Sequence, residues 1–77
     1  NFTRVFTRET GISPARYVAE ARLAAARDRL EQSRDTLDRI ALQTGFGSSI
    51  NLRRTFERQL HLTPGEYRQR FHRRTLA

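Results

Sequence analysis

The stretch "IALQTGFGSSINLRRTF", residues 40–56, decides the fold. Ile40 and Ala41 begin this stretch, and they lie three and four residues after Leu37, which is the spacing of one helix face. Asp35 or Thr36 can cap the helix that this spacing predicts over residues 36–43. The segment "TGFG", residues 44–47, then places two glycines around a phenylalanine, which indicates a tight turn.

A second helix is expected after this turn, with Ser48 or Ser49 as its N-cap. Leu52 and Phe56 lie four apart and form its buried side. The polar residues of the same helix fall outside that side: Asn51, Arg53, Arg54 and Arg58. Two helices joined by a tight turn, the second with a basic outer face, predict a helix-turn-helix.

Helices are also expected on either side of this unit. Ser13 and Pro14 can begin one that lasts to about Gln32. Its predicted apolar stripe consists of Tyr17, Val18, Ala21, Ala25 and Leu30. Residues 1–10 read as a further helix, which Gly11 ends.

A last helix is predicted to begin at Pro64. Thr63 and Glu66 have the spacing of a capping box around it. Tyr67 and Phe71 form its buried side. No run of residues alternates as a strand requires, so the fold class is all-α with five helices.

The chain contains a blurred internal repeat. "RVFTRETGISPARY", residues 4–17, aligns with "RTFERQLHLTPGEY", residues 54–67, at an offset of 50. The register holds through a helix, a turn and the start of another helix. We therefore predict a remnant of a first helix-turn-helix at residues 1–12, a linker helix at 13–32 and a complete second unit at 33–77. The first unit lacks its upstream helix, so we expect the chain to be a fragment, truncated at its N-terminus.

The composition indicates an acidic partner. The 77 residues carry a formal net charge of +7, and all 15 basic residues are arginine. A coding bias explains the absence of lysine better than binding chemistry does, but the net charge still requires an explanation. There is no cysteine for a disulfide or a thiolate metal site. No apolar run reaches the roughly 20 residues of a membrane span, and no signal peptide opens the chain, so a soluble cytoplasmic protein is expected.

Double-stranded DNA is the partner that this chemistry favours. Arginine can read guanine and asparagine can read adenine from a helix in the major groove, while Ser48 and free helix N–H groups can hold phosphates. The alternatives are a merely solvated helix face and a basic protein-interaction module that binds an acidic partner. RNA is less suitable because its A-form major groove is closed to side chains. His61 and His72 lack carboxylates at ligand spacing, so neither an enzyme nor a metal or cofactor site is expected.

The chain resembles the AraC/XylS-type transcription regulators, whose DNA-binding domain has two helix-turn-helix units joined by a long helix. The resemblance rests on "SPARYVAEARLAAARDRL", residues 13–30, and on "IALQTGFGSSINLRRTFERQLHLTPGEYRQRF", residues 40–71. It covers essentially the whole chain. The segments around residues 1–17 and 45–56 are most similar to the subgroup whose N-terminal domain is amidase-like, of the DJ-1/PfpI type.

The resemblance implies roles for individual residues. The base-facing candidates are Thr3, Arg4, Ser49, Ile50, Asn51, Arg53 and Arg54. Independently of the resemblance, the phosphate candidates are Arg8, Ser48 and Arg58, and Arg58, nearer the end of its helix, has either a phosphate or a solvent role. Ile50 departs from the family pattern, in which a polar residue is more usual, and it can touch a thymine methyl group or pack. His61 stands where the first repeat has Gly11, which suggests a helix cap with positive φ.

The resemblance also implies partners and a location. Such a regulator works in the bacterial cytoplasm on the nucleoid, with RNA polymerase as a possible partner and with oligomerisation through a missing N-terminal domain. The predicted linker helix of 19 residues spans about 28 Å, close to the 34 Å of one DNA turn. One copy of the chain could therefore place both reading helices in successive major grooves.

Overall fold

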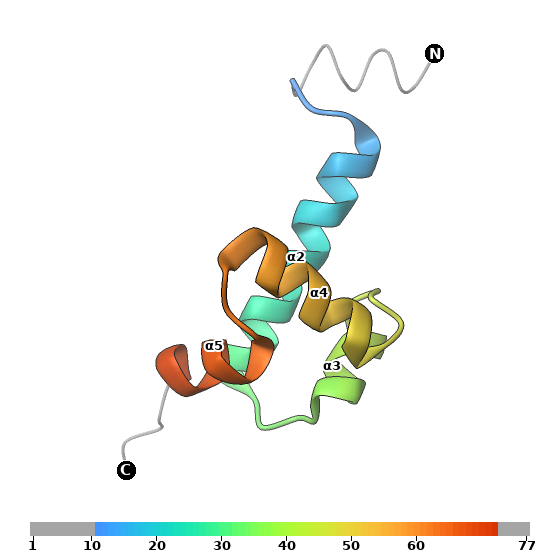
Figure 1. Cartoon of the computed structure of the whole chain (residues 1–77). Coiled ribbons are helices and arrows are strands. Elements are labelled where there is room, and N and C mark those ends of the chain that lie inside the picture. Colours follow the sequence, from blue (N-terminus) through green and yellow to red (C-terminus); the bar gives the residue numbers. More distant parts are fainter. Residues whose placement is uncertain (1–10, 73–77) are drawn as a thin grey trace.

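Four helices make up the part of the chain that the computed structural model describes, residues 11–72, and this part contains no strand. They are α2 (Pro14–Gln32), α3 (Leu37–Gln43), α4 (Ser49–Leu60) and α5 (Pro64–Phe71). The three shorter helices gather around the C-terminal half of α2, and the N-terminal turns of α2 extend beyond them (Figure 1). The all-α prediction is confirmed. The helix predicted at residues 1–10 lies outside the described residues.

Each of the four helices begins with the same local device. A hydroxyl oxygen of the N-cap residue accepts a hydrogen bond from the backbone N–H three residues on, at 3.1–3.2 Å. The capping residues are Ser13, Thr36, Ser48 and Thr63. The predicted capping box of α5 is confirmed, because Glu66 Oε1 also accepts from the Thr63 N–H at 2.9 Å. Asp35, the other candidate cap of α3, instead forms an ion pair with Arg29 at 2.6 Å.

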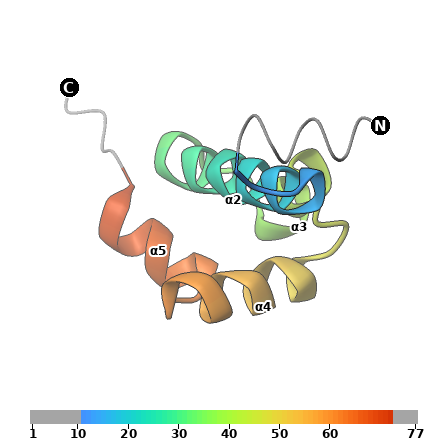
Figure 2. The ribbon, with the colours of Figure 1, turned by 90° about the horizontal axis from the view of Figure 1, so that it is seen from above.

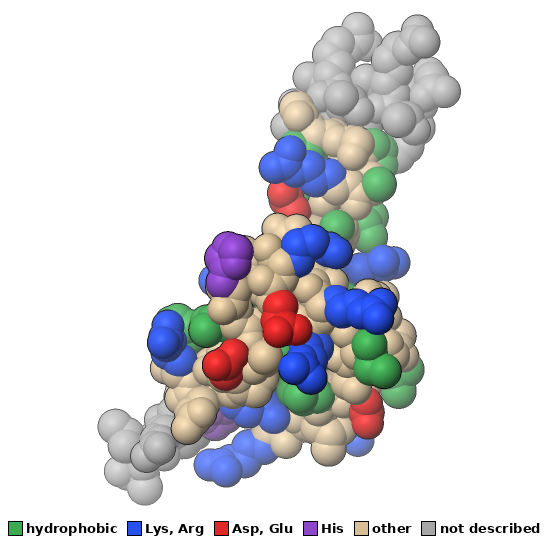
Figure 3. All heavy atoms as spheres, in the orientation of Figure 1, with side chains coloured by type: hydrophobic (Ala, Val, Ile, Leu, Met, Phe, Trp, Pro, Cys, Tyr) green, Lys and Arg blue, Asp and Glu red, His purple; other side chains and the backbone are tan. Residues whose placement is uncertain are grey.

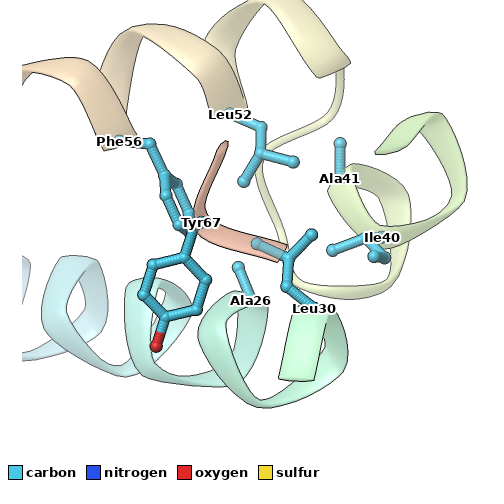
Figure 4. Close-up of a cluster of buried hydrophobic side chains, with 7 residues drawn as sticks. All are labelled: Ala26, Leu30, Ile40, Ala41, Leu52, Phe56 and Tyr67. Atoms are coloured by element: carbon cyan, nitrogen blue, oxygen red, sulfur yellow. The ribbon is translucent and has the colours of Figure 1, made fainter. Parts of the chain in front are cut away.

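The core takes side chains from all four helices. Leu52 and Phe56 of α4 are fully buried, as predicted, and they point toward α2 and α3 (Figure 4). The Phe56 ring meets the Tyr67 ring edge to face, with 5.6 Å between centroids. The remaining core residues are Ala26, Leu30, Ile40 and Ala41. Helix α4 is therefore held by two fully buried side chains and by Leu60, which is partly buried against the same core.

The predicted apolar stripe of α2 is wrong except at Leu30. Tyr17 and Val18 are 52% and 42% exposed, and both Ala21 and Ala25 are exposed. The face that packs instead carries Leu23, Ala26 and Leu30, which are spaced three and four apart. The error arose because alanines occur all around α2, so the pattern does not single out one face. Neither α2 nor any other described helix has the length and apolarity needed to cross a bilayer.

Helix α5 is attached to α2 through Tyr67. The Tyr67 hydroxyl accepts a hydrogen bond from Arg27 Nε at 3.1 Å and donates one to the Glu31 carboxylate. Burial raises the pKa of Tyr67 above its usual range, so its hydroxyl keeps the proton that it donates. Phe71, also predicted to be buried, is 46% exposed. It is the last residue of α5, one turn beyond Tyr67, and therefore lies at the edge of the core.

Helix α4 ends at a strained residue. His61, the C-cap, has φ 60° and ψ 25°, which is the left-handed conformation expected from the repeat. The side chain of His61 is exposed, so little packing depends on it. Replacing His61 with glycine removes the conformational strain but makes the unfolded chain more flexible. We expect His61→Gly to raise stability by roughly 0.5 kcal/mol, or about 2–4 °C in Tm. An unchanged or lower Tm in thermal unfolding would contradict this.

Candidate nucleic-acid interface

The turn between α3 and α4 is built from two left-handed glycines. Gly45 has φ 89° and Gly47 has φ 83°, a backbone region that residues other than glycine rarely adopt. The N–H groups of Phe46 and Gly47 both donate to the Ala41 carbonyl, at 2.9 and 3.1 Å. Thr44 is buried and its hydroxyl donates to the Ile40 carbonyl at 2.6 Å. The carbonyl groups at the C-terminal end of α3 thus accept hydrogen bonds from the backbone of the turn and from the Thr44 side chain.

Helix α2 limits the room beside this turn. A Cβ added to Gly45 would lie 2.7 Å from Nε of Arg22, and would also crowd the Cδ and Cγ of that side chain. The exposed Arg22 side chain can move aside, so it is the dihedral angle of Gly45 that requires glycine here. Nothing within 4 Å restricts Gly47 in the same way.

Asn51 connects the turn to α4. Its backbone N–H donates to the Ser48 hydroxyl at 3.2 Å, and its side-chain Nδ2 donates to the Phe46 carbonyl at 3.0 Å. The second contact was not expected from the sequence, although an Asn five residues after a carbonyl in a glycine turn could have indicated it. One side-chain N–H and the amide oxygen of Asn51 keep their capacity for another partner. Its base-facing role stays a prediction.

Helix α4 runs along the edge of the molecule opposite α2 (Figure 2). Its predicted residues lie on the side of the helix that does not carry Leu52 and Phe56, although Arg58 also lines a hollow together with residues of α2. We call this side the outer face and define it by Ser49, Ile50, Asn51, Arg53, Arg54 and Arg58. All of them are exposed except Ser49, which is partly buried, and Ile50 is 64% exposed. Figure 3 shows basic side chains across this view of the molecule, with acidic side chains between them. Leu52 and Phe56 hold the opposite side of α4 in the core.

The arginines of the outer face differ in their surroundings. Arg53 Nε is 3.3 Å from the carboxylate of Glu57, one turn further along α4. Neither Arg54 nor Arg58 forms an ion pair with any residue within 11–72. Their guanidinium groups are consequently available to an external acceptor, whereas Arg53 is already oriented by Glu57. The other candidates, Thr3, Arg4 and Arg8, lie outside the described residues.

A hollow of about 440 Å³ borders the N-terminal end of the outer face. Helix α4 contributes Ser49, Ile50 and Arg53 to it. The opposite wall comes from the start of α3 and the start of α5: Leu37, Thr63, Pro64 and Gly65. No local pattern indicated that the first turn of α5 lies beside the outer face, since this depends on how α5 packs.

A family model described as "Helix-turn-helix domain" matches residues 1–70. This match covers nearly the whole chain. The segments at residues 13–30 and 40–71 identify the AraC/XylS branch among helix-turn-helix proteins. The chain belongs to the AraC/XylS family. The order of α3, the glycine turn and α4 is the helix-turn-helix of such a domain, and α2 is the long helix that precedes it.

Proteins similar to this AraC/XylS-family chain include transcription regulators from several bacteria. The HTH-type transcriptional regulator Rv1931c of Mycobacterium tuberculosis is 45% identical over 71 residues, which are 92% of this chain and 27% of that protein. The HTH-type transcriptional activator RhaS of Klebsiella pneumoniae is 35% identical over 66 residues, which are 86% of this chain and 24% of that protein. The chain thus spans about a quarter of the length of these curated relatives.

A solved structure has the same fold. It is the DNA-binding domain of the global transcriptional factor AdpA, crystallised in complex with a target DNA. The TM-score is 0.83 at 36% sequence identity, and the alignment covers 91% of this chain and 63% of that one. The AdpA domain and the present chain therefore share both their helix arrangement and a clear sequence relationship.

Proposed function

We propose that this chain binds double-stranded DNA in a sequence-specific manner and forms the DNA-binding part of a bacterial transcription regulator. The observation that carries the proposal is the outer face of α4. Its arginines are exposed while Leu52 and Phe56 fix the same helix to the core, so the helix can enter a major groove without leaving the fold. The AdpA domain, which was crystallised with a target DNA, supports this reading through its similarity.

The contacts of the outer face determine the roles that we propose. Arg54 reads a guanine, because it has no competing ion pair in the described part of the chain. Ile50, exposed at the N-terminal end of α4, contacts a thymine methyl group. Ser49 and Arg53 face neighbouring bases, and Asn51 combines a base contact with its bond to the turn. Ser48 and Arg58 hold phosphates on either side.

The same proposal covers the N-terminal part of the chain. Thr3 and Arg4 face bases and Arg8 a phosphate, from a first unit at residues 1–12. Residues 13–32 link this unit to the second one at residues 33–77. With α2 spanning about 28 Å, the two units occupy successive major grooves. The intact regulator acts in the cytoplasm on the nucleoid, contacts RNA polymerase and oligomerises through an N-terminal domain of the amidase-like, DJ-1/PfpI type.

A basic protein-interaction module is the second candidate, favoured by the net charge of +7 alone. We propose no catalytic role for either candidate.

Salt dependence of duplex binding separates the two candidates. A protein that neutralises about five phosphates should lose affinity with a slope of roughly −4 to −5 in log K against log salt. Fluorescence anisotropy of a labelled random-sequence duplex measures this slope, with an acidic peptide of equal charge as control. Tighter binding to the peptide than to the duplex at every salt concentration would favour the interaction module.

A further inference from the structure

We propose that Arg34, Arg68 and His72 form a phosphate-binding pocket on α5, separate from the outer face of α4. The pocket has a volume of about 410 Å³ and is lined by these three residues and Gln69. Arg34 lies in the connection between α2 and α3, and the other three lie at the end of α5. Helix α5 packs beside the C-terminal end of α2 (Figures 1 and 2), which brings these distant segments together.

The pocket contains polar atoms that lack hydrogen-bond partners. Nε and Nη2 of Arg68 and Nε2 of His72 are buried and make no hydrogen bond within the described part of the chain. A buried guanidinium group without an acceptor is unfavourable, because it has lost its water and gained nothing in return. These N–H groups are closed to solvent, so an anion in the pocket would supply their acceptor by drawing the Arg68 side chain outward.

The carboxylates nearest to the pocket in sequence already have partners. Asp35 is bound to Arg29 at 2.6 Å, and Glu31 accepts from the Tyr67 hydroxyl. Among residues 11–72, no carboxylate lines the pocket itself. The two arginines thus carry positive charge that no neighbouring acidic side chain neutralises, and the preferred ligand is an anion.

A phosphate group fits this donor set better than a carboxylate does. The guanidinium fork of the exposed Arg34, and that of Arg68 once turned into the pocket, can each bind two oxygens, and the Gln69 amide and the His72 ring also line the pocket. Such a set suits several oxygens arranged around a tetrahedral centre. The source is either a backbone phosphate of bound duplex or a free phosphate ion. The duplex source rests on the proposed function, since α5 also packs against α4.

The test compares Arg68→Gln and Arg34→Gln with Arg70→Gln. Arg70 is an exposed arginine on the same helix that lines a different hollow, so it controls for the loss of one charge. Binding to a random-sequence duplex is measured over a range of salt concentrations. If the pocket holds a backbone phosphate, Arg68→Gln and Arg34→Gln each reduce the salt slope by about one, and Arg70→Gln reduces it less. Thermal unfolding reports whether the variants fold, and the exposed Arg34 keeps the test valid if Arg68→Gln does not.

A second measurement identifies the source. Inorganic phosphate is titrated into the wild-type protein without DNA while the arginine Nε resonances are recorded by NMR. Free phosphate is the ligand if two results are found together. The Arg68 Nε resonance shifts saturably in the wild-type protein but not in Arg34→Gln, and the variants leave the salt slope of DNA binding unchanged. Equal slopes for all three variants and no saturable shift would overturn the pocket. If the affinity of the wild-type protein for duplex does not fall as salt rises, the proposed function is refuted. The phosphate titration would then still show whether the pocket binds phosphate.

Discussion

Phe56→Ala is expected to lower the free energy of unfolding by about 3–5 kcal/mol, the usual range for removing a buried aromatic ring. Phe56 is fully buried and meets Tyr67 edge to face, so its loss leaves a cavity between α4 and α5. Small domains have total stabilities of roughly 5–15 kcal/mol, and a core this thin places the chain at the lower end. We therefore expect the variant to be largely unfolded at 37 °C. Urea denaturation followed by far-UV circular dichroism measures the change.

Leu42→Ala is the matched control for Phe56→Ala. Leu42 is also a large apolar residue in a helix of the helix-turn-helix, but it is 70% exposed. Its replacement should change stability by less than about 0.5 kcal/mol. If both variants lose stability equally, the assignment of α4 to the core is wrong.

Arg54→Ala is expected to weaken binding to a selected DNA site by roughly 10- to 100-fold and to relax base preference at one position. The reason is that a bidentate contact from arginine to guanine discriminates against every other base, and Arg54 has no ion-pair partner within residues 11–72 to hold it back. Sites are first selected from a random DNA pool, and affinities for the selected and random duplexes are then compared.

Arg58→Ala provides the comparison on the same helix. We propose that Arg58 contacts a phosphate, so Arg58→Ala should weaken binding to all duplexes to a similar extent. It should also reduce the slope of log K against log salt by about one. Equal losses on selected and random DNA for Arg54→Ala would assign Arg54 to the backbone as well. In that case the reading of bases would fall to Ile50, Asn51 and Arg53.

Most of the helix-turn-helix could be predicted from the sequence because its signals are local. The four N-caps and the left-handed His61 depend only on residues a few positions away. Ser13, Thr63 and His61 are where the sequence places them, and Thr36 and Ser48 are each one of the two caps that it allowed. The outer face followed from the two buried positions Leu52 and Phe56, since a helix that buries one side exposes the other. The base and phosphate roles stay predictions, because they concern a partner.

Other features could not be read from the pattern. Alanine occurs on both the packed and the exposed sides of α2, so composition could not show that Ala26 is buried while Ala21 and Ala25 are exposed. Phe71 has the spacing of a core residue, but α5 ends there and the core does not extend to it. Asn51 was expected to face a partner, whereas part of its amide binds the turn.

The sequence by itself determined the start of each described helix to within one residue, the glycine turn between α3 and α4, and the basic side of α4. Capping bonds and glycine dihedral angles are properties of short segments, so they do not depend on long-range contacts. Only the tertiary structure decided which face of α2 is packed and where α5 lies. Those features depend on contacts such as Arg27 to Tyr67, 40 residues apart, and Tyr67 to Glu31, 36 apart. The cluster of Arg34, Arg68 and His72 has the same origin: only packing brings it together.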